Sequence, residues 1–209
     1  MRITISVPCF ARPQRTIRAI ECIANQNING WEALVVGDGC EVMKDFILSN
    51  YFSDIVKNAN SRGNDLKISN NPENKGGSGY YITNQNIQRA KGKYFVFYAN
   101  DDVILPNHLE NYLSEIEGTV YDFVYFNSYI EPYNSIRDSS LRFGGLGHSE
   151  IIIRTDFLRN MPPHNADYGH DWKLIEAMIK NDGKYKKAVN KPYTYIVKSL
   201  PIAREIGID

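Results

Sequence analysis

Two adjacent carboxylates, Asp101 and Asp102, follow an apolar run that extends from Tyr94 to Ala99, with only Asn100 between the run and the pair. Neighbouring carboxylates that leave a buried strand repel each other unless a cationic group lies beside them, and Mg²⁺ or Mn²⁺ prefers such oxygen ligands. The pair therefore predicts a divalent metal site with Asp101 and Asp102 as ligands. The structural alternative is that Asp102 caps a helix starting near Pro106, while Asp101 is solvated.

Polar residues also follow the first two apolar runs of the chain, at residues 8–12 and 38–39. These runs alternate with stretches that repeat apolar residues every three or four positions, as Ile17, Ile20 and Ile23 do. The alternation predicts an α/β fold with a mostly parallel central sheet flanked by helices. Because ligands bind such sheets outside the carboxyl ends of the strands, we expect the polar segments to form one site.

The expected elements follow from these periodicities and from the positions of glycine and proline. Strands are predicted at 2–10, 31–37, 66–69, 94–99, 121–129, 150–154, 185–189 and 193–197. Helices are predicted at 13–26, 41–50, 80–90, 106–116, 155–160 and 171–181, with Pro106 as the first helical residue of the fourth. Residues 58–65 read as a polar loop, and residues 130–147 read as irregular.

Length and composition exclude several classes of protein. The chain has 209 residues, with 24 basic against 24 acidic side chains, so a single domain is expected and no basic surface invites nucleic acid. Three cysteines, Cys9, Cys22 and Cys40, lack the spacing of a metal site and are expected to be reduced. No apolar run approaches the length of a membrane span, so we expect no integral membrane segment and a cytoplasmic location.

A glycine-rich segment, Gly76-Gly77-Ser78-Gly79, follows Lys75. It lacks the lysine of a phosphate-binding P-loop, and no G-x-G-x-x-G follows the first strand, which argues against P-loop kinases and Rossmann dehydrogenases. The segment is either a tight turn or a set of backbone amides near a phosphate, with Lys75 as the counter-charge.

Three stretches together resemble the GT-A fold nucleotide-sugar glycosyltransferases, in particular the large inverting group of spore-coat and polysaccharide enzymes. The stretches are ISVPCFARPQRTIRAIECIANQ with WEALVVGDG, NKGG with NQNIQRAKGKYFVFYANDDVILPNHL, and YGHDWKLIEAM. The resemblance implies a Rossmann-like GT-A domain over residues 1–209, with a nucleotide-binding half at 1–102 and an acceptor-binding half at 103–209. A narrower resemblance is to capsid-glycosylating transferase domains of large DNA viruses.

The resemblance implies a UDP-sugar donor and Mn²⁺ or Mg²⁺. Asp38 would accept a hydrogen bond from the base, which favours uracil, and Asp101 would be the first choice of metal ligand, with Asp102 the second. The family often has D-x-D-D at this place, and Ala99 stands where its first aspartate would be. The residues implied to contact the donor are Pro8, Cys9, Phe10, Arg12, Asp38, Lys75, Gly77, Asn100 and Asp101.

On the acceptor side the resemblance implies that Asp171 is the general base that deprotonates a hydroxyl of a glycan or glycoprotein acceptor. His148, His170 and Trp172 would shape the acceptor pocket, and transfer would invert the anomeric centre. The structural alternative for Asp171 is a helix N-cap. Two other functions remain open: a non-catalytic nucleotide-sugar or glycan-binding module, and a nucleotidyltransferase that makes nucleotide sugars.

Overall fold

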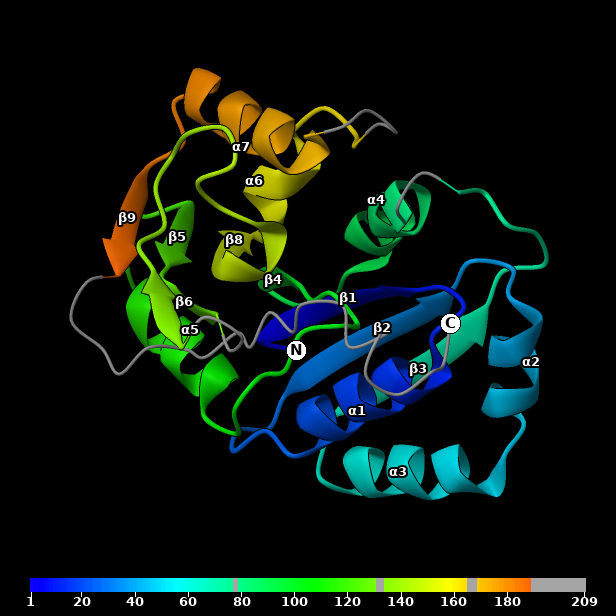
Figure 1. The fold of residues 1–209 in the computed structure, drawn as a ribbon. Coiled ribbons are helices and arrows are strands. Elements are labelled where there is room, and N and C mark those ends of the chain that lie inside the picture. Colours follow the sequence, from blue (N-terminus) through cyan, green and yellow to red (C-terminus); the bar gives the residue numbers. More distant parts are fainter. Residues whose placement is uncertain (77–78, 131–133, 165–168, 189–209) are drawn as a thin grey trace.

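The computed structural model of the chain describes residues 1–76, 79–130, 134–164 and 169–188. Its centre is a seven-stranded sheet in the order β3-β2-β1-β4-β8-β5-β9 (Figure 1). These strands are β1 (Ile3–Cys9), β2 (Trp31–Gly37), β3 (Asp65–Asn70), β4 (Tyr94–Phe97), β5 (Phe123–Phe126), β8 (Ile151–Arg154) and β9 (Tyr185–Ala188). The predicted strand at 193–197 lies outside the described residues.

The sheet is mostly parallel, as the sequence predicts. β8 alone among the described strands of this sheet runs against its two neighbours, β4 and β5. After β1 the chain adds β2 and then β3 on one side, and β4 then pairs with the other side of β1. Strand order therefore reverses between β1 and β4, which is where α/β sheets bind their ligands.

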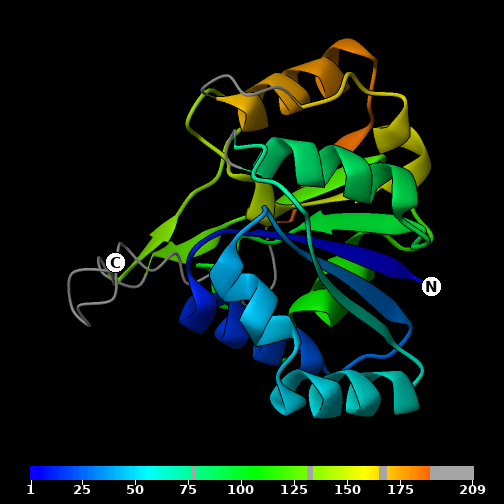
Figure 2. The same cartoon turned by 90° about the vertical axis from the view of Figure 1, so that its right-hand side faces the viewer.

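Helices cover both faces of the sheet (Figures 1 and 2). One face carries α1 (Pro13–Ala24), α2 (Glu41–Ile47), α3 (Asn50–Ser61) and α5 (His108–Ile116). The other carries α4 (Tyr80–Arg89), α6 (Thr155–Arg159) and α7 (His170–Lys180). Each layer encloses an apolar core: Ile20 and Ile23 of α1 pack on the first face, while Ile175 and Met178 of α7 pack on the second. Because both faces are covered, every residue of β2 is buried, which explains its continuous apolar run.

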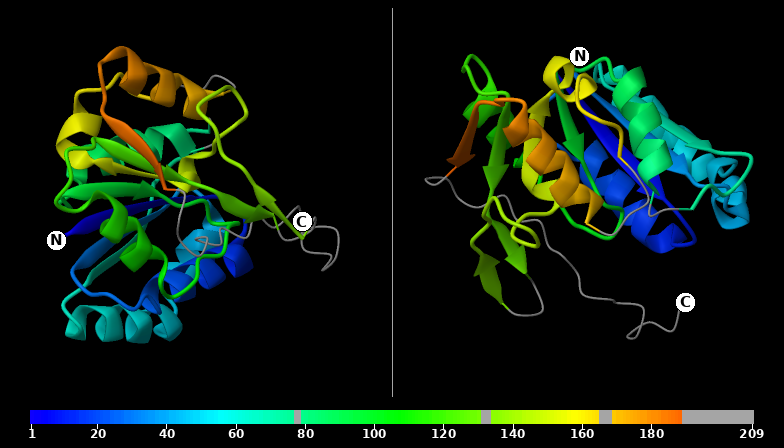
Figure 3. Two further views of the ribbon diagram at one scale, coloured as in Figure 1. Left: turned by 90° about the vertical axis from the view of Figure 1, so that its left-hand side faces the viewer. Right: turned by 90° about the horizontal axis from the view of Figure 1, so that it is seen from above.

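Three elements differ from the sequence-based prediction. Residues 58–61, read as loop, belong to α3, whose Phe52 and Ala59 are buried against the core. The strand predicted at 121–129 is divided into β5 and β6 (Ser128–Ile130), and β6 forms a hairpin with β7 (Ser135–Arg137) of the segment read as irregular, which extends beyond the carboxyl end of β5 (Figure 3). Pro106 precedes α5 instead of opening it, because the helix begins at His108 after an Asn107 cap.

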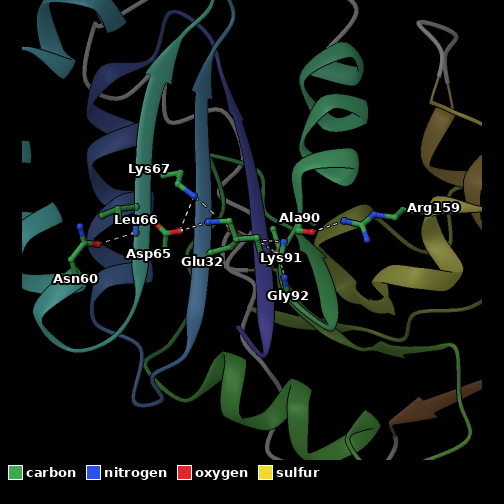
Figure 4. Close-up of polar contacts among 10 residues, drawn as sticks. Glu32, Asn60, Asp65, Leu66, Lys67, Ala90, Lys91, Gly92 and Arg159 are labelled. Atoms are coloured by element: carbon green, nitrogen blue, oxygen red, sulfur yellow. Dashed lines mark hydrogen bonds and ion pairs between the residues drawn. The ribbon is translucent and has the colours of Figure 1, made fainter.

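A buried carboxylate at the amino end of β2 ties the strands together (Figure 4). Glu32 is fully buried and accepts hydrogen bonds from the Thr4 hydroxyl at 2.6 Å and from the backbone N–H of Lys91. The Lys67 ammonium lies 3.9 Å from the second carboxylate oxygen. Buried charge is stabilised only when it is paired and hydrogen-bonded, so this network fixes the sheet edge opposite the predicted site.

None of the helices in the described ranges is long and apolar enough to cross a membrane.

Candidate active site

The reversal point between β1 and β4 brings Asp101 against two arginines, Arg12 at the N-cap of α1 and Arg15 within α1. The Nη1 atoms of Arg12 and Arg15 lie 3.4 and 3.6 Å from Asp101 Oδ2. Arg18 donates to the backbone carbonyl of Asp101 at 3.1 Å. Sequence analysis singled out Arg12 but missed Arg15 and Arg18. The feature that could have identified them is that successive arginines are three residues apart, a spacing that puts side chains near one another along a helix.

The two carboxylates proposed as metal ligands lie in different environments. Asp101 keeps a side chain that is 36% exposed, whereas Asp102 is 4% exposed and accepts a 2.5 Å hydrogen bond from the Ser149 hydroxyl. Arginines thus supply cationic charge beside Asp101, so repulsion within the pair does not by itself require a metal. The structural alternative for Asp102 is wrong, because the N-cap residue of α5 is Asn107, and the first-turn N–H of Leu109 donates to Gln26 Oε1 at 2.9 Å.

The residues at the carboxyl end of β1 differ in their exposure. Cys9 is buried, and burial raises the pKa of its thiol to about 12, so this side chain is a neutral core group. Its carbonyl accepts a hydrogen bond from the Asp38 backbone N–H at 2.9 Å. Phe10 is 52% exposed, and Pro8 is half-buried against Gly79, where an added Cβ would lie 2.7 Å from Pro8 Cβ.

Asp38 organises the segment that leads to α4. Its buried carboxylate accepts backbone hydrogen bonds from Lys75 at 3.0 Å and from Gly76 at 2.9 Å, one on each oxygen. Asp38 therefore has a positioning role that sequence analysis did not foresee. The Lys75 ammonium pairs with Glu73 at 2.9 Å, which raises the Lys75 pKa. Gly77 lies outside the described residues.

Asn100 holds the loop of residues 100–102 against α1, because its Nδ2 donates to the Thr16 hydroxyl at 3.1 Å. Its side chain is buried, with 9% of the residue exposed. The amide of Asn100 is thus directed toward α1, where it positions Asp101.

Asp171 lies in the first turn of α7, whose N-cap is Gly169, so the N-cap alternative for Asp171 is wrong. Its side chain is 37% exposed, and Oδ1 lies 3.2 Å from His170 Nε2. Trp172, expected in the acceptor pocket, is half-buried and packs against the core cluster of the α7 face.

Three histidines gather beside Asp171. The rings of His148, His164 and His170 have centroids 4.8 to 6.0 Å apart, and the His148 ring stacks on Phe97 at 4.4 Å. Sequence analysis named His148 and His170 but missed His164. His164 is 7% exposed, and burial, followed by the neighbouring imidazoles, lowers its pKa to about 3. This imidazole is therefore neutral at pH 7.

The histidines connect the two halves of the site. His148 is followed by Ser149, which donates to Asp102, and His170 is followed by Asp171. The carboxylate loop after β4 and the carboxylate on α7 thus belong to one continuous region at the carboxyl edge of β4.

A mostly parallel seven-stranded sheet with carboxylates at its reversal point and on a facing helix defines a GT-A fold glycosyltransferase. The chain belongs to glycosyl transferase family 2, whose family model matches residues 4–179.

Two relatives are also described as glycosyltransferases. A protein named as a colanic acid biosynthesis glycosyl transferase, WcaA of Escherichia coli (strain K12), is 30% identical over 131 residues, covering 61% of this chain and 43% of that protein. A glycosyltransferase of Rickettsia bellii (strain RML369-C), described as uncharacterized, is 25% identical over 143 residues, covering 64% of this chain and 19% of that protein. The match therefore spans less than half the length of either relative.

Solved structures share the fold at low sequence identity. S. aureus TarS 1-349 in complex with UDP has a TM-score of 0.71 and 18% identity over 94% of this chain and 60% of that chain. The mannosyltransferase PcManGT from Pyrobaculum calidifontis, in complex with GDP-Man and Mn²⁺, has a TM-score of 0.74 and 12% identity. The match covers 96% of this chain and 57% of that chain. These similarities establish the GT-A fold.

Proposed function

We propose that this chain transfers a sugar from a UDP-sugar to a hydroxyl of a glycan or glycoprotein, with inversion and with Asp171 as general base. The observation that carries the proposal is the continuity of Asp171, the histidines and the Asp101-Asp102 loop at one sheet edge. A partly exposed carboxylate can contact an acceptor hydroxyl and accept its proton.

The proposed role of Asp171 is to deprotonate the acceptor hydroxyl. A sugar hydroxyl is a weak acid, so it attacks the anomeric carbon efficiently only when a carboxylate accepts its proton, which contributes typically ~10²–10⁴-fold in rate. The Asp171 carboxylate would accept that proton, with His170 Nε2 at 3.2 Å holding the side chain in orientation. Direct attack by the acceptor, with one base and no protein nucleophile, inverts the anomeric centre.

Negative charge develops on the leaving diphosphate, so a cation near it would stabilise the transition state. Asp101 could supply that cation by binding a metal ion, and Arg12 and Arg15 lie beside it. Mn²⁺ or Mg²⁺ bound at Asp101 would act as a Lewis acid toward the diphosphate. The exposed part of the Asp101 carboxylate fits such an ion, but Arg12 and Arg15 compete for the same oxygen. Asp102 fits less well, because Ser149 already occupies one of its oxygens.

The choice of UDP rests on the resemblance of the Asp38 segment and on the TarS complexes with UDP and with UDP-GlcNAc. PcManGT binds GDP-Man instead, so GDP is the competitor that a test must include. The nucleotidyltransferase alternative is set aside by the family match, whereas a non-catalytic binding module shares the family's fold.

The test uses calorimetry with UDP and GDP, with Mn²⁺ and with chelator, on the wild type and Asp101→Ala. Mn²⁺-dependent UDP binding that Asp101→Ala abolishes supports the donor site. GDP bound more tightly than UDP, or a folded protein that binds neither, refutes the UDP assignment.

Turnover is measured as UDP released from a panel of UDP-sugars, with water as acceptor. Asp171→Asn should bind donor as the wild type does but release UDP ~10²–10⁴-fold more slowly. Glu176→Gln, on the same helix and 46% exposed, is the matched control and should keep wild-type rates. A wild type that binds donor without turnover would favour the binding-module function.

A further inference from the structure

The three histidines beside Asp171 come from three separate segments of the chain. His148 opens the short 3-10 helix at His148–Glu150, His164 follows the Pro162-Pro163 pair, and His170 is the first residue of α7. Their candidate ligand nitrogens all lie within 4.8 Å of one another. Within the part of the chain that the structure describes, they form the one group of three histidine, cysteine or acidic side chains that is close enough to share an ion.

His164 shows that this cluster is more than packing. Its side chain is buried, and neither ring nitrogen has a hydrogen-bond partner among the described residues. Buried polar groups are nearly always satisfied, and an unsatisfied one costs free energy. Its backbone is held in place instead, because Asn84 of α4 exchanges two hydrogen bonds with the backbone of His164 at 2.8 and 2.9 Å. The backbone of His164 is therefore held in place, and its ring lies next to two other imidazoles while neither ring nitrogen has a partner in the described part of the chain.

We infer that His148, His164 and His170 form a binding site for a transition-metal ion of the Zn²⁺ type, separate from the carboxylate at Asp101. Neutral imidazole is a preferred ligand of Zn²⁺, Co²⁺ and Ni²⁺, whereas Mg²⁺ and Mn²⁺ favour oxygen ligands. The cluster and the carboxylate loop thus select different ions.

To bind one ion, the three imidazole rings must move slightly closer together. An ion with Zn–N bonds of about 2.0–2.1 Å and tetrahedral angles holds its nitrogens about 3.4 Å apart. The present separations of up to 4.8 Å therefore shorten by roughly 1.4 Å at most, which side-chain rotation can supply. Three histidines leave the fourth position of a tetrahedral ion for another ligand.

The bound ion would cross-link the segments that carry Ser149 and Asp171. An ion that binds only the folded state stabilises it by mass action, so Zn²⁺ should raise the melting temperature of the chain. The inference does not rest on the proposed transfer activity, and its readouts need neither donor nor acceptor.

The experiment starts from chain freed of metal by a chelator and then dialysed. Calorimetry with Zn²⁺ should show one ion per chain, and Co²⁺ should give the visible absorption of a tetrahedral nitrogen-bound ion, while excess Mg²⁺ competes with neither. His170→Gln and His164→Gln should each weaken Zn²⁺ binding by about 100-fold or more and remove the Zn²⁺-induced rise in melting temperature. His170 is 20% exposed, so its substitution carries the test if His164→Gln fails to fold.

Two control variants separate this site from others. His108→Gln removes the fourth histidine of the chain, which is buried in α5, and should bind Zn²⁺ as the wild type does. Asp101→Asn should also keep Zn²⁺ binding even if it loses UDP, which separates this inference from the proposed function. The inference is overturned if the folded wild type binds no Zn²⁺, or if His170→Gln binds it unchanged.

Discussion

Ser149 donates a 2.5 Å hydrogen bond to the carboxylate of Asp102 in the interior of the site. Both residues are buried, at 5% and 4% exposure, and Tyr112 holds the Ser149 backbone carbonyl through its hydroxyl at 2.7 Å. The loop that ends β4 is thereby attached to the segment that carries His148. The Ser149 hydroxyl thus links the loop of Asp101 and Asp102 to the segment that carries His148.

Replacing Ser149 by alanine should therefore destabilise the fold. The buried Asp102 carboxylate loses a short charge-assisted donor, which costs about 1–3 kcal/mol in the free energy of unfolding. Urea denaturation measures this change. Ser61→Ala is the control, because the Ser61 hydroxyl bonds its own helix at an exposed position and its loss should cost about 0.5 kcal/mol or less. Equal stability of the two variants would contradict the role assigned to Ser149.

Arg15 should oppose metal binding at Asp101. The guanidinium lies 3.6 Å from Asp101 Oδ2, so an incoming cation must displace or tolerate it. Because Asp101 is 36% exposed, solvent screens the pair and its contribution is about 1 kcal/mol or less. Arg15→Met should therefore tighten Mn²⁺ binding by roughly 2- to 5-fold, which paramagnetic resonance of free Mn²⁺ measures.

Arg62→Met is the matched control for this measurement, because Arg62 lies at the end of α3 and donates to the Ala24 carbonyl. Its Mn²⁺ affinity should equal that of the wild type. Weaker Mn²⁺ binding in Arg15→Met would show that the arginine helps to build the metal site instead of competing for it.

Asp38 should control the order of the segment at residues 70–76. Its two carboxylate oxygens accept the Lys75 and Gly76 amides, and Asp38→Asn keeps an acceptor for only one of them. Hydrogen bonds to a charged group contribute about 1.5–3 kcal/mol each, so amide exchange at one or both positions should accelerate by roughly 10- to 100-fold. Asp54→Asn, at an exposed surface pair with Lys57, should leave the exchange unchanged. Unaltered protection in Asp38→Asn would refute the positioning role.

Much of the fold could be predicted because the strands next to the reversal point are buried on both faces. β2 occupies 31–37 as expected, and β1 falls within its predicted range of 2–10. α3 was missed because its polar surface obscures Phe52, Ile55, Val56 and Ala59, which do recur at helical spacing. The β6–β7 hairpin has strands of three residues each, too short to carry a periodicity.

The site was less accessible to sequence reasoning because its partners are distant in the chain. The negative charge at Asp101 was recognised, but its partner on α1 depends on β1 and β4 lying side by side. His164 had no local signal, since its neighbours in space arrive from residues 148 and 170. A single site residue can be identified from a local motif. A cluster of residues that are distant in the chain can be identified only when the order and pairing of the strands are known.

The buried His108 should make the fold sensitive to mild acid. Burial lowers its pKa from the ordinary 6.5 to about 3, so the unfolded chain binds a proton in this interval and the folded chain does not. The contribution to stability is complete above the unfolded pKa and is lost as the pH falls from about 6.5 toward 3, by up to about 1.4 kcal/mol per pH unit. His108→Gln, which cannot take up this proton, should show a shallower fall in the free energy of unfolding between about pH 7 and pH 5. Urea denaturation across that range measures both slopes, and metal-free protein keeps the other histidines comparable. Parallel slopes for wild type and variant would mean that His108 is protonated in the folded state, contrary to its burial against Tyr112.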